Sequence, residues 1–396
     1  MTTTRREFLQ TTAALAACTG LAPLAAPLRR ERAAPALVAV YLRGGADFLN
    51  MLIPYRDPAY RAARPGIGLG EEDGVLPLDD QFALHPALAA LRPLYQDKRL
   101  APVICTGSPH PTRSHFEAQD FMEYAAPGNH GVREGWISRY LRATARPGAS
   151  EFRAVALQAN LPRALRGEFP ALAVPEGKRR RNDVLEQFDS FYGGEGGAVS
   201  ESGRRTIDIL RRFHEIAAAA PAGKEAAYPD ADLARRLKTI AGFIRAGAGL
   251  EVVGLDYDGW DHHAGQGGIG GRHAEMLRTL AESLAAFYRD LGPHADATLT
   301  LCMTEFGRTV RENGNDGTDH GRGGGMLLLG GGVRGGKVYG DWRGLEAKAL
   351  IEGRDLPVTT DFRDVFASCL AGCFGFEPPR DFFPDYTPAL LAAFRR

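Results

Sequence analysis

A continuous apolar run near the start of the chain, residues 36–42 (ALVAVYL), constrains the fold most strongly. Apolar residues without polar alternation are typical of a strand that is buried on both faces, as in parallel sheets covered by helices. The run ends in a glycine turn, and Asp47 follows that turn. Ligands of open α/β sheets bind at the carboxyl ends of the strands, so this turn is a candidate site loop.

Similar apolar runs alternate with segments of helical spacing along the rest of the chain. We predict strands at residues 100–105, 152–157, 250–255, 297–303 and 326–329, and helices at 85–94, 114–122 and 364–371. This alternation predicts an α/β fold, a three-layer α/β/α sandwich with a mostly parallel central sheet. We expect residues 35–396 to form a single domain, with a charged helical insertion around residues 175–249.

Composition excludes some classes of function. Apolar residues make up 44% of the 396 positions, which is ample for a core of this size. Lys+Arg and Asp+Glu both number 48, so the formal charge is zero and no basic face is indicated. Because nucleic-acid partners require such a face, we expect no nucleic acid to bind. The five cysteines show no spacing typical of a disulfide framework.

We interpret the first 34 residues as an export signal with a linker, and we do not assign them to the folded domain. Arg5 and Arg6 precede an alanine-rich apolar stretch, residues 8–26, that is too short and too weakly apolar for a comfortable membrane span. This arrangement resembles a twin-arginine signal peptide. It implies the twin-arginine export machinery as a partner and a periplasmic or cell-surface location.

The end of the signal has two interpretations. Residues 15–18 (LAAC) resemble a lipoprotein cleavage box, which would make Cys18 a lipid anchor. Alternatively, Cys18 is simply a small residue within the apolar stretch. Ordinary cleavage after Ala26 would place Pro27 next, a residue that signal peptidases disfavour.

Four polar clusters follow the predicted strands or lie in the loops after them. They are residues 44–50 (GGADFLN), 110–116 (HPTRSHF), 256–263 (DYDGWDHH), and the pair 304–309 (TEFGRT) and 317–321 (GTDHG). Carboxylates and imidazoles gathered at one rim of a sheet are what a divalent metal requires. Imidazole suits zinc or manganese, and carboxylate oxygens suit these ions as well as magnesium or calcium.

Ser114 lies at the predicted start of a helix and has two interpretations. With Glu117 it matches a Ser-x-x-Glu capping box. A helix N-terminus also stabilises the oxygens of a phosphate or sulfate ester, which favours a nucleophile there. Arg113 and Arg308 are either anion clamps for such a substrate or partners in surface salt bridges.

Together these motifs resemble domain-of-unknown-function family 1501 over essentially the whole mature chain, and that family is similar to the sulfatase and alkaline-phosphatase superfamily. The resemblance implies an alkaline-phosphatase-like fold with Ser114 as nucleophile, or Thr112 as the fallback. It also implies metal ligation by Asp47, and by Asp261 with His263.

The superfamily pattern also has an Asp-His-Gly segment and a final histidine, and two alignments compete for them. Asp319, His320 and Gly321 match the segment directly, but no histidine follows them. We prefer the alignment in which Glu305-Phe306-Gly307 takes that place after a strand and His320 is the final histidine. Phe306 then replaces one histidine ligand, and a second metal site is reduced to Asp47, Ser114 and Glu305.

The sequence therefore favours an exported metal-dependent hydrolase of phosphate or sulfate esters. The alternative is a non-catalytic binding or assembly protein that keeps the fold and part of the metal site, and a surface glycan binder is a third reading. We predict that the side chains of the site meet at the carboxyl rim of one sheet, with Asp319 at the edge. The predicted set comprises Asp47, Ser114, Asp261, His263, Glu305 and His320.

Overall fold

The computed structural model describes residues 33–174, 198–220, 223 and 226–395. Arg5, Arg6, Cys18 and the basic cluster at residues 178–181 lie outside these residues, so the predictions made for them stay predictions.

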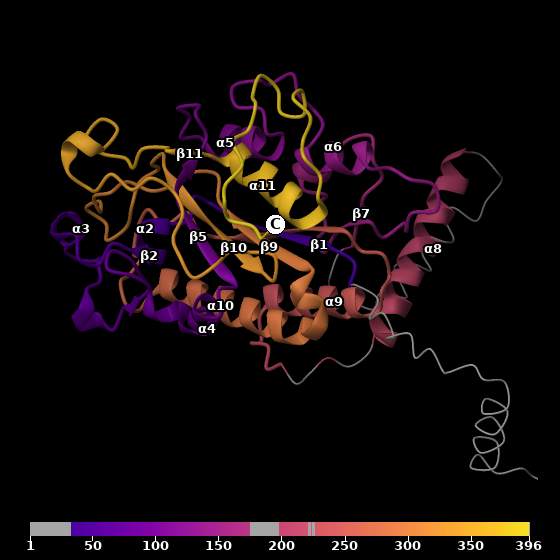
Figure 1. Ribbon diagram of the computed structural model, residues 1–396, viewed down its shortest axis with the longest axis horizontal. Coiled ribbons are helices and arrows are strands. Elements are labelled where there is room, and N and C mark those ends of the chain that lie inside the picture. Colours follow the sequence, from indigo (N-terminus) through magenta and orange to yellow (C-terminus); the bar gives the residue numbers. More distant parts are fainter. Residues whose placement is uncertain (1–32, 175–197, 221–222, 224–225, 396) are drawn as a thin grey trace, which may run out of the picture. The chain divides into compact units, whose positions relative to one another are not determined.

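An eight-stranded sheet forms the centre of the fold, in the order β11-β5-β10-β9-β1-β8-β6-β7 (Figure 1). Its strands are β1 (Ala36–Arg43), β5 (Leu100–Gly107), β6 (Ala154–Ala156), β7 (Leu172–Ala173), β8 (Val252–Asp258), β9 (Thr298–Met303), β10 (Gly324–Gly330) and β11 (Thr360–Asp361). Strand β10 is antiparallel to both of its neighbours, and the other pairings are parallel. The predicted α/β class with a mostly parallel sheet is confirmed.

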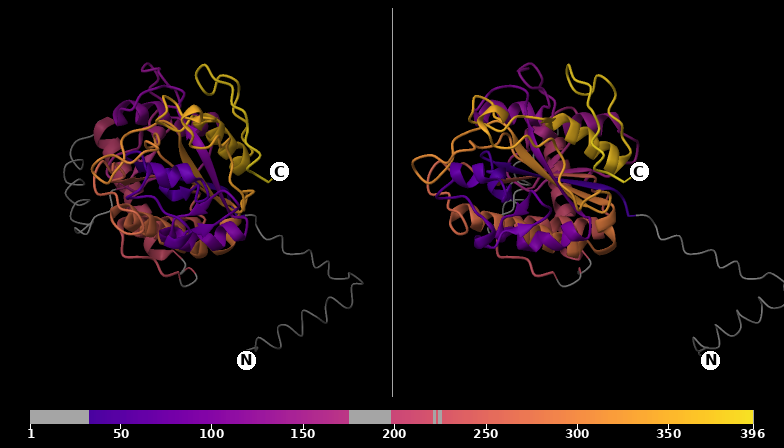
Figure 2. Two further views of the ribbon diagram at one scale, coloured as in Figure 1. Left: turned by 90° about the vertical axis from the view of Figure 1, so that its left-hand side faces the viewer. Right: turned by 60° about the vertical axis from the view of Figure 1, so that its left-hand side comes forward.

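Helices cover both faces of this sheet, and the turned views show the same layering (Figures 1 and 2). One face carries α4 (Arg92–Gln96), α8 (Ala198–Ala219), α9 (Asp232–Arg245) and α10 (Arg272–Leu291), and the other carries α5 (His115–Glu123), α6 (Trp136–Ala143) and α11 (Phe362–Phe374). Strand β1 alternates between the two cores. Val38 packs in the cluster that contains Leu280 of α10, and Leu37 in the cluster that contains Trp136 of α6. Because β1 is buried on both sides, it has the continuous apolar sequence described above.

Smaller elements extend one end of the fold. They include α2 (Phe48–Met51), α3 (Pro58–Ala63) and a three-stranded sheet of β2 (Leu52–Ile53), β4 (Ala83–Leu84) and β3 (Leu76–Pro77). The helix predicted at residues 85–94 is instead a 3-10 helix, η2 (Pro86–Leu91), followed by the short α4. Pro93 explains the division, because proline has no N–H for the hydrogen bond that a continuous helix would need at this position. Pro86 and Pro93 each stand in the first turn of their own helix, where proline is tolerated.

Four further 3-10 turns are η1 (Glu71–Asp73), η3 (Arg163–Leu165), η4 (Gly292–Asp296) and η5 (Ala347–Ala349). Within the described ranges, no helix combines the length and the apolar character needed to cross a membrane.

Candidate metal site

The candidate site is assembled from the loops after β1, β8 and β9 together with the start of α5. Gly44 shows how closely these loops approach one another. Its φ is +117°, and an added Cβ would lie 2.6 Å from the backbone nitrogen of Asp261. The Gly44 N–H also donates to Glu305 at 2.9 Å. Only a residue without a side chain fits at this point, so the glycine turn fixes how the loops meet.

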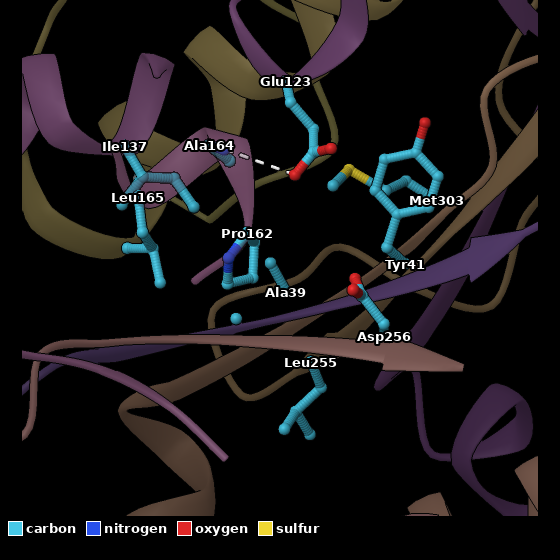
Figure 3. Close-up of a pocket in the computed structure, with 11 residues that line it drawn as sticks. Ala39, Tyr41, Glu123, Ile137, Pro162, Ala164, Leu165, Leu255, Asp256 and Met303 are labelled. Atoms are coloured by element: carbon cyan, nitrogen blue, oxygen red, sulfur yellow. Dashed lines mark hydrogen bonds between the residues drawn. The ribbon is translucent and has the colours of Figure 1, made fainter. Parts of the chain in front are cut away.

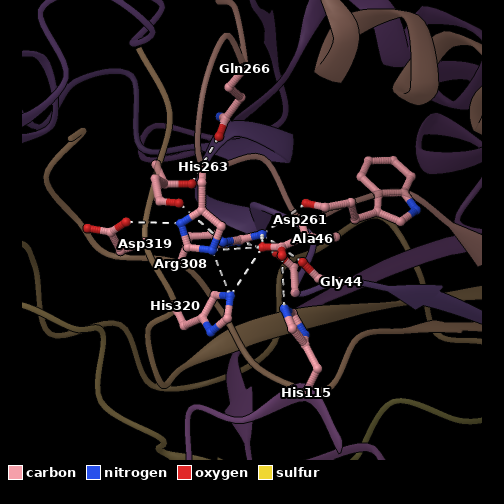
Figure 4. Close-up of polar contacts among 12 residues, drawn as sticks. Gly44, Ala46, His115, Asp261, His263, Gln266, Arg308, Asp319 and His320 are labelled. Atoms are coloured by element: carbon pink, nitrogen blue, oxygen red, sulfur yellow. Dashed lines mark hydrogen bonds and ion pairs between the residues drawn. The ribbon is translucent and has the colours of Figure 1, made fainter. Parts of the chain in front are cut away.

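Three imidazoles and one carboxylate face a common point (Figure 4). The Nε2 atoms of His263 and His320 are 2.9 Å apart, and each lies 3.1 Å from Asp261 Oδ1. The Nε2 atom of His115 lies 3.3 Å from Asp261 Oδ2. The side chains of Asp261 and His263 are 42% and 46% exposed, so the cluster opens to solvent.

The outer nitrogen of each imidazole is held by an acceptor. His115 Nδ1 donates to Glu305 at 2.8 Å and His263 Nδ1 to Asp319 at 3.0 Å. His320 Nδ1 donates to the backbone carbonyl of Arg113 at 2.7 Å. Carbonyl and ionised carboxylate oxygens only accept, so Nδ1 of each ring carries a proton and Nε2 is the nitrogen that is left to bind a metal.

Within the described chain, the buried Nε2 atom of His115 has no hydrogen-bond partner, so it is free to bind a cation at this point. Metal-bound histidines show the same arrangement, with the second ring nitrogen donating to a carboxylate or a carbonyl. Ligand atoms of His115, Asp261 and His320 all lie within 4.8 Å of one another. These three residues therefore fit a divalent metal, and His263 Nε2 lies close enough to His320 and Asp261 to be a candidate further ligand.

Glu305 is a support for this cluster and not one of its inward-facing groups. The carboxylate is fully buried and accepts from His115, from Gln119 at 2.9 Å and from the Gly44 N–H. Burial raises the pKa of Glu305, but the hydrogen bonds from His115 and Gln119 outweigh this effect and lower it overall. An ionised Glu305 keeps the His115 ring in place.

Arg308 holds the loops together from within. Its buried guanidinium donates to the carbonyls of Gly44 and Gly45, and to Asp261 Oδ1 at 2.5 Å. Burial raises the pKa of Asp261, but the hydrogen bond from Arg308 prevails and lowers it to about 2. Of the two alternatives that the sequence left open for Arg308, the structure shows an ion pair, which is buried and not at the surface.

Arg113 is also paired within the protein. Its guanidinium binds Asp355 at 2.6 Å and Glu352 at 3.2 Å. Of the two alternatives that the sequence left open for Arg113, the structure shows the salt bridge. Its backbone carbonyl nevertheless belongs to the site through His320.

Ser114 is the N-cap residue of α5, but its side chain makes no capping hydrogen bond. The predicted capping box is therefore wrong. Glu117 accepts from the Thr112 hydroxyl at 2.7 Å, and the Ser114 N–H donates to that same hydroxyl at 3.1 Å. The hydroxyl of Thr112 is thus committed to local structure, and that of Ser114 is not used as a cap.

Asp47 does not join the cluster, which corrects the predicted convergence. Its carboxylate is 1% exposed and binds the Arg64 guanidinium through both oxygens, at 2.6 and 3.1 Å. Gln266 donates to it at 2.6 Å. The buried charge is thus neutralised by an arginine from another loop, and Asp47 ties loops together instead of facing the other site residues.

The remaining predicted residues lie around the cluster. The side chain of Asp319 is 51% exposed and holds His263 from outside, at the edge that the preferred alignment predicted. Phe306 is buried, with its ring centroid 4.9 Å from that of His115 and 5.0 Å from that of His320.

His115 is the site residue that the sequence reasoning missed. It lies within one of the four polar clusters, next to Ser114, the first residue of the predicted helix. The available signal was a histidine in the first turn of a helix that follows a buried strand.

A charged network continues behind Glu305. Arg43 donates to Gln119 at 3.2 Å and pairs with Glu123 at 3.1 Å and with Asp256 at 2.7 Å. A cavity beside this network, lined by Tyr41, Glu123 and Asp256 among others, has room for about one water molecule (Figure 3). Burial raises the pKa of Glu123 despite the nearby arginine.

Residues 34–377 match the sequence model of a protein family that is described as "Protein of unknown function (DUF1501)". The chain belongs to this family. No curated protein matches the DUF1501 chain.

The solved structures that this DUF1501 chain is similar to include a periplasmic domain and two phosphonate monoester hydrolases. With the zinc complex of the C-terminal periplasmic domain of Escherichia coli EptC it shares 10% identity, over 75% of this chain and 73% of the other, at a TM-score of 0.34. With the phosphonate monoester hydrolase of Silicibacter pomeroyi it shares 14% identity over 90% and 78%, at 0.35. With that of Agrobacterium radiobacter it shares 13% over 85% and 73%, at 0.27.

Proposed function

We propose that this chain is an exported metal-dependent hydrolase of phosphate or sulfate esters. The observation that carries the proposal is the inward-facing set of three imidazole Nε2 atoms and one carboxylate, open to solvent beside the start of α5. A donor set of three nitrogens and one carboxylate favours zinc or manganese over magnesium or calcium. When bound, the metal would supply Lewis-acid stabilisation of a negatively charged ester.

Ser114 is the proposed nucleophile. It stands at the N-terminus of a nine-residue helix, where backbone N–H groups and the helix dipole favour anionic oxygens. Its hydroxyl oxygen bonds to phosphorus or sulfur, the bond to the ester oxygen breaks, and the alcohol leaves with the proton of the serine hydroxyl. Water then attacks phosphorus or sulfur, which releases phosphate or sulfate and returns a proton to the serine. Thr112 is less suited because its hydroxyl is donated to Glu117.

The other residues hold this arrangement. Asp261 remains ionised because Arg308 lowers its pKa. Glu305 and Asp319 orient the rings of His115 and His263. With both arginines engaged in the protein, the metal and the α5 N-terminus are left to stabilise the substrate anion.

A screen of phosphate and sulfate monoesters with Zn²⁺, Mn²⁺, Mg²⁺ or Ca²⁺ tests the proposal. We expect turnover by the wild type and a loss on the order of a thousandfold or more in Ser114→Ala, with metal content unchanged. Thr112→Ser, which keeps the hydroxyl that binds Glu117 and the Ser114 N–H, is the matched control and should keep most of the activity.

Metal-loaded protein without turnover on any ester would contradict the proposal and support the alternative, a non-catalytic binding or assembly protein. That alternative would be favoured if His263 binds the metal together with His115, Asp261 and His320, since zinc sites with four protein ligands are structural.

Export by the twin-arginine route belongs to the same proposal and rests on the sequence at Arg5 and Arg6. Replacing both with lysine should leave the precursor in the cytoplasm, as measured by fractionation. Normal extracytoplasmic accumulation of the double variant would refute the route. In the same fractions, Cys18→Ser distinguishes a lipid anchor from a cleaved signal, since only an anchored protein would be released from the membrane.

A further inference from the structure

Phe116 is the most exposed large apolar side chain in the described part of the chain. Its exposed fraction is 82%, compared with 56% for Ile269 and 51% for Leu390. It directly follows His115 in the first turn of α5. A single exposed apolar residue is common on protein surfaces, but this one directly follows a residue of the metal site.

The core-facing side of α5 carries Ala118, Phe121 and Met122, all of them buried. Helical periodicity places Phe116 away from these residues and on the face of Gln119, three positions further along. Gln119 donates to Glu305, the carboxylate that holds His115. Asp120, four positions along, also neighbours Phe116 and pairs with Arg163, so Phe116 lies on the exposed side of α5 next to the residue whose amide reaches Glu305.

Phe116 lies one turn closer to the helix N-terminus than Gln119 does. Helical side chains lean back toward the N-terminus, so its ring extends toward the helix start, where Ser114 lies. No contact within the helix requires an aromatic residue here, since the side chain is almost fully in water. When the charged end of a substrate is bound at the metal and the α5 N-terminus, the group attached to its ester oxygen would lie next to this ring.

We propose that Phe116 is a specificity-determining residue that packs on an apolar, preferably aromatic, group on the ester oxygen of the substrate. The substrate class is then an aryl or similarly hydrophobic monoester, with its charged end at the metal site. The inference rests on the proposed function for the location of the anion. Ring-on-ring contact and removal of both surfaces from water supply the preference.

The test compares a phenyl ester with the corresponding methyl ester. In Phe116→Ala, kcat/KM for the phenyl ester should fall roughly tenfold, mainly through KM, and that for the methyl ester should stay within about twofold. Phe116→Trp should restore the preference for the phenyl ester. Leu390→Ala, which also removes an exposed apolar side chain, is the matched control and should change neither value.

Binding of phenylphosphonate and methylphosphonate by calorimetry separates this inference from the proposed function. If no ester is turned over, the hydrolase proposal fails, but a loss of phenylphosphonate affinity confined to Phe116→Ala still supports the apolar subsite. Equal effects on the phenyl and methyl probes, or no effect on either, overturn the inference. Because Phe116 is exposed, the thermal midpoint should not change, and this confirms that each variant is folded.

Discussion

Each imidazole of the candidate metal site is oriented by one acceptor on its outer nitrogen. These acceptors differ in their own environment, since Glu305 is buried and Asp319 is half exposed. Water does not compete for the hydrogen bond between a ring and a buried carboxylate. A ring that loses its buried partner therefore finds no water to replace it. Glu305 should therefore matter more than Asp319 for metal affinity.

We expect Glu305→Gln to weaken metal binding roughly 10- to 100-fold, the usual effect of losing an outer partner of a metal-bound histidine. The neutral amide still reaches His115, but it no longer increases the basicity of the ring. Competition with a chelating dye measures the change in Kd. Glu117→Gln, on the same helix, should bind metal as the wild type does, and equal affinity of all three proteins would show that Glu305 does not support the site.

Two further histidines are buried next to each other, with ring centroids 5.6 Å apart. His262 and His273 are 2% and 0% exposed, and within the described chain none of their ring nitrogens has a hydrogen-bond partner. Burial lowers the pKa of His273 to about 3. The unfolded chain therefore takes up a proton near pH 6.5, and the folded chain does so only near pH 3, so stability is lost as pH falls through this range.

Replacement by leucine removes this titration. We expect His273→Leu to lose less stability than the wild type between pH 7 and pH 5, by about 2 kcal/mol. Urea denaturation in the presence of a chelator measures this without a contribution from bound metal. His130→Gln, at an exposed position, should follow the wild type. Parallel pH curves for His273→Leu and the wild type would show that His273 does not titrate as the buried environment requires.

At the scale of elements, the site depends on the turn that follows β1. Gly44 combines a positive φ with backbone atoms of the 260–261 segment in contact distance. A side chain here meets both a steric and a conformational penalty, because the neighbouring atoms belong to the main chain and cannot rotate away.

Gly44→Ala should lower the free energy of unfolding by about 2–4 kcal/mol, since strain and overpacking add. It should also weaken metal binding, because the added Cβ displaces Asp261. Gly314→Ala is the control, since its added Cβ meets nothing within 4 Å, and it should change stability by less than about 0.5 kcal/mol. Urea denaturation measures the free energy of unfolding of both variants. Similar values for Gly44→Ala and Gly314→Ala would show that the turn is not tightly packed.

The strands were predictable because a strand buried on both faces has a sequence that tolerates only apolar residues, as in β1. The antiparallel direction of β10 was not predictable, because an apolar run does not indicate whether a buried strand is parallel or antiparallel to its neighbours. Asp47 was placed wrongly because its partner, Arg64, lies in a segment with no recognisable motif. The pairing of histidines with outer acceptors was also beyond prediction, since the Arg113 carbonyl carries no side-chain signal at all.

At the scale of the whole molecule, the site joins distant parts of the sequence. His115 begins α5, Asp261 and His263 follow β8, and His320 precedes β10. A metal bound by all of them favours the folded state, because the unfolded chain does not bring these ligands together.

Saturating Zn²⁺ should therefore raise the thermal midpoint of the chelator-treated protein, on the order of 3–5 °C at about a hundred times Kd. The His320→Ala variant should show no such rise, because it lacks one inward-facing nitrogen. Differential scanning calorimetry measures both. An identical rise in the two proteins would place the stabilising ion elsewhere on the surface.

The position of β1 in the sheet also has a consequence for synthesis. Leu37 is among the first residues of the fold to leave the ribosome, yet it pairs with Val252 on one side and Leu299 on the other. The central strand thus remains without neighbours until most of the chain has been made, and pairings this distant in sequence form slowly. Nascent chains would need protection from aggregation during this interval. A cell that exports this protein folded, as proposed, must hold it back from the translocase until the last strands have been added.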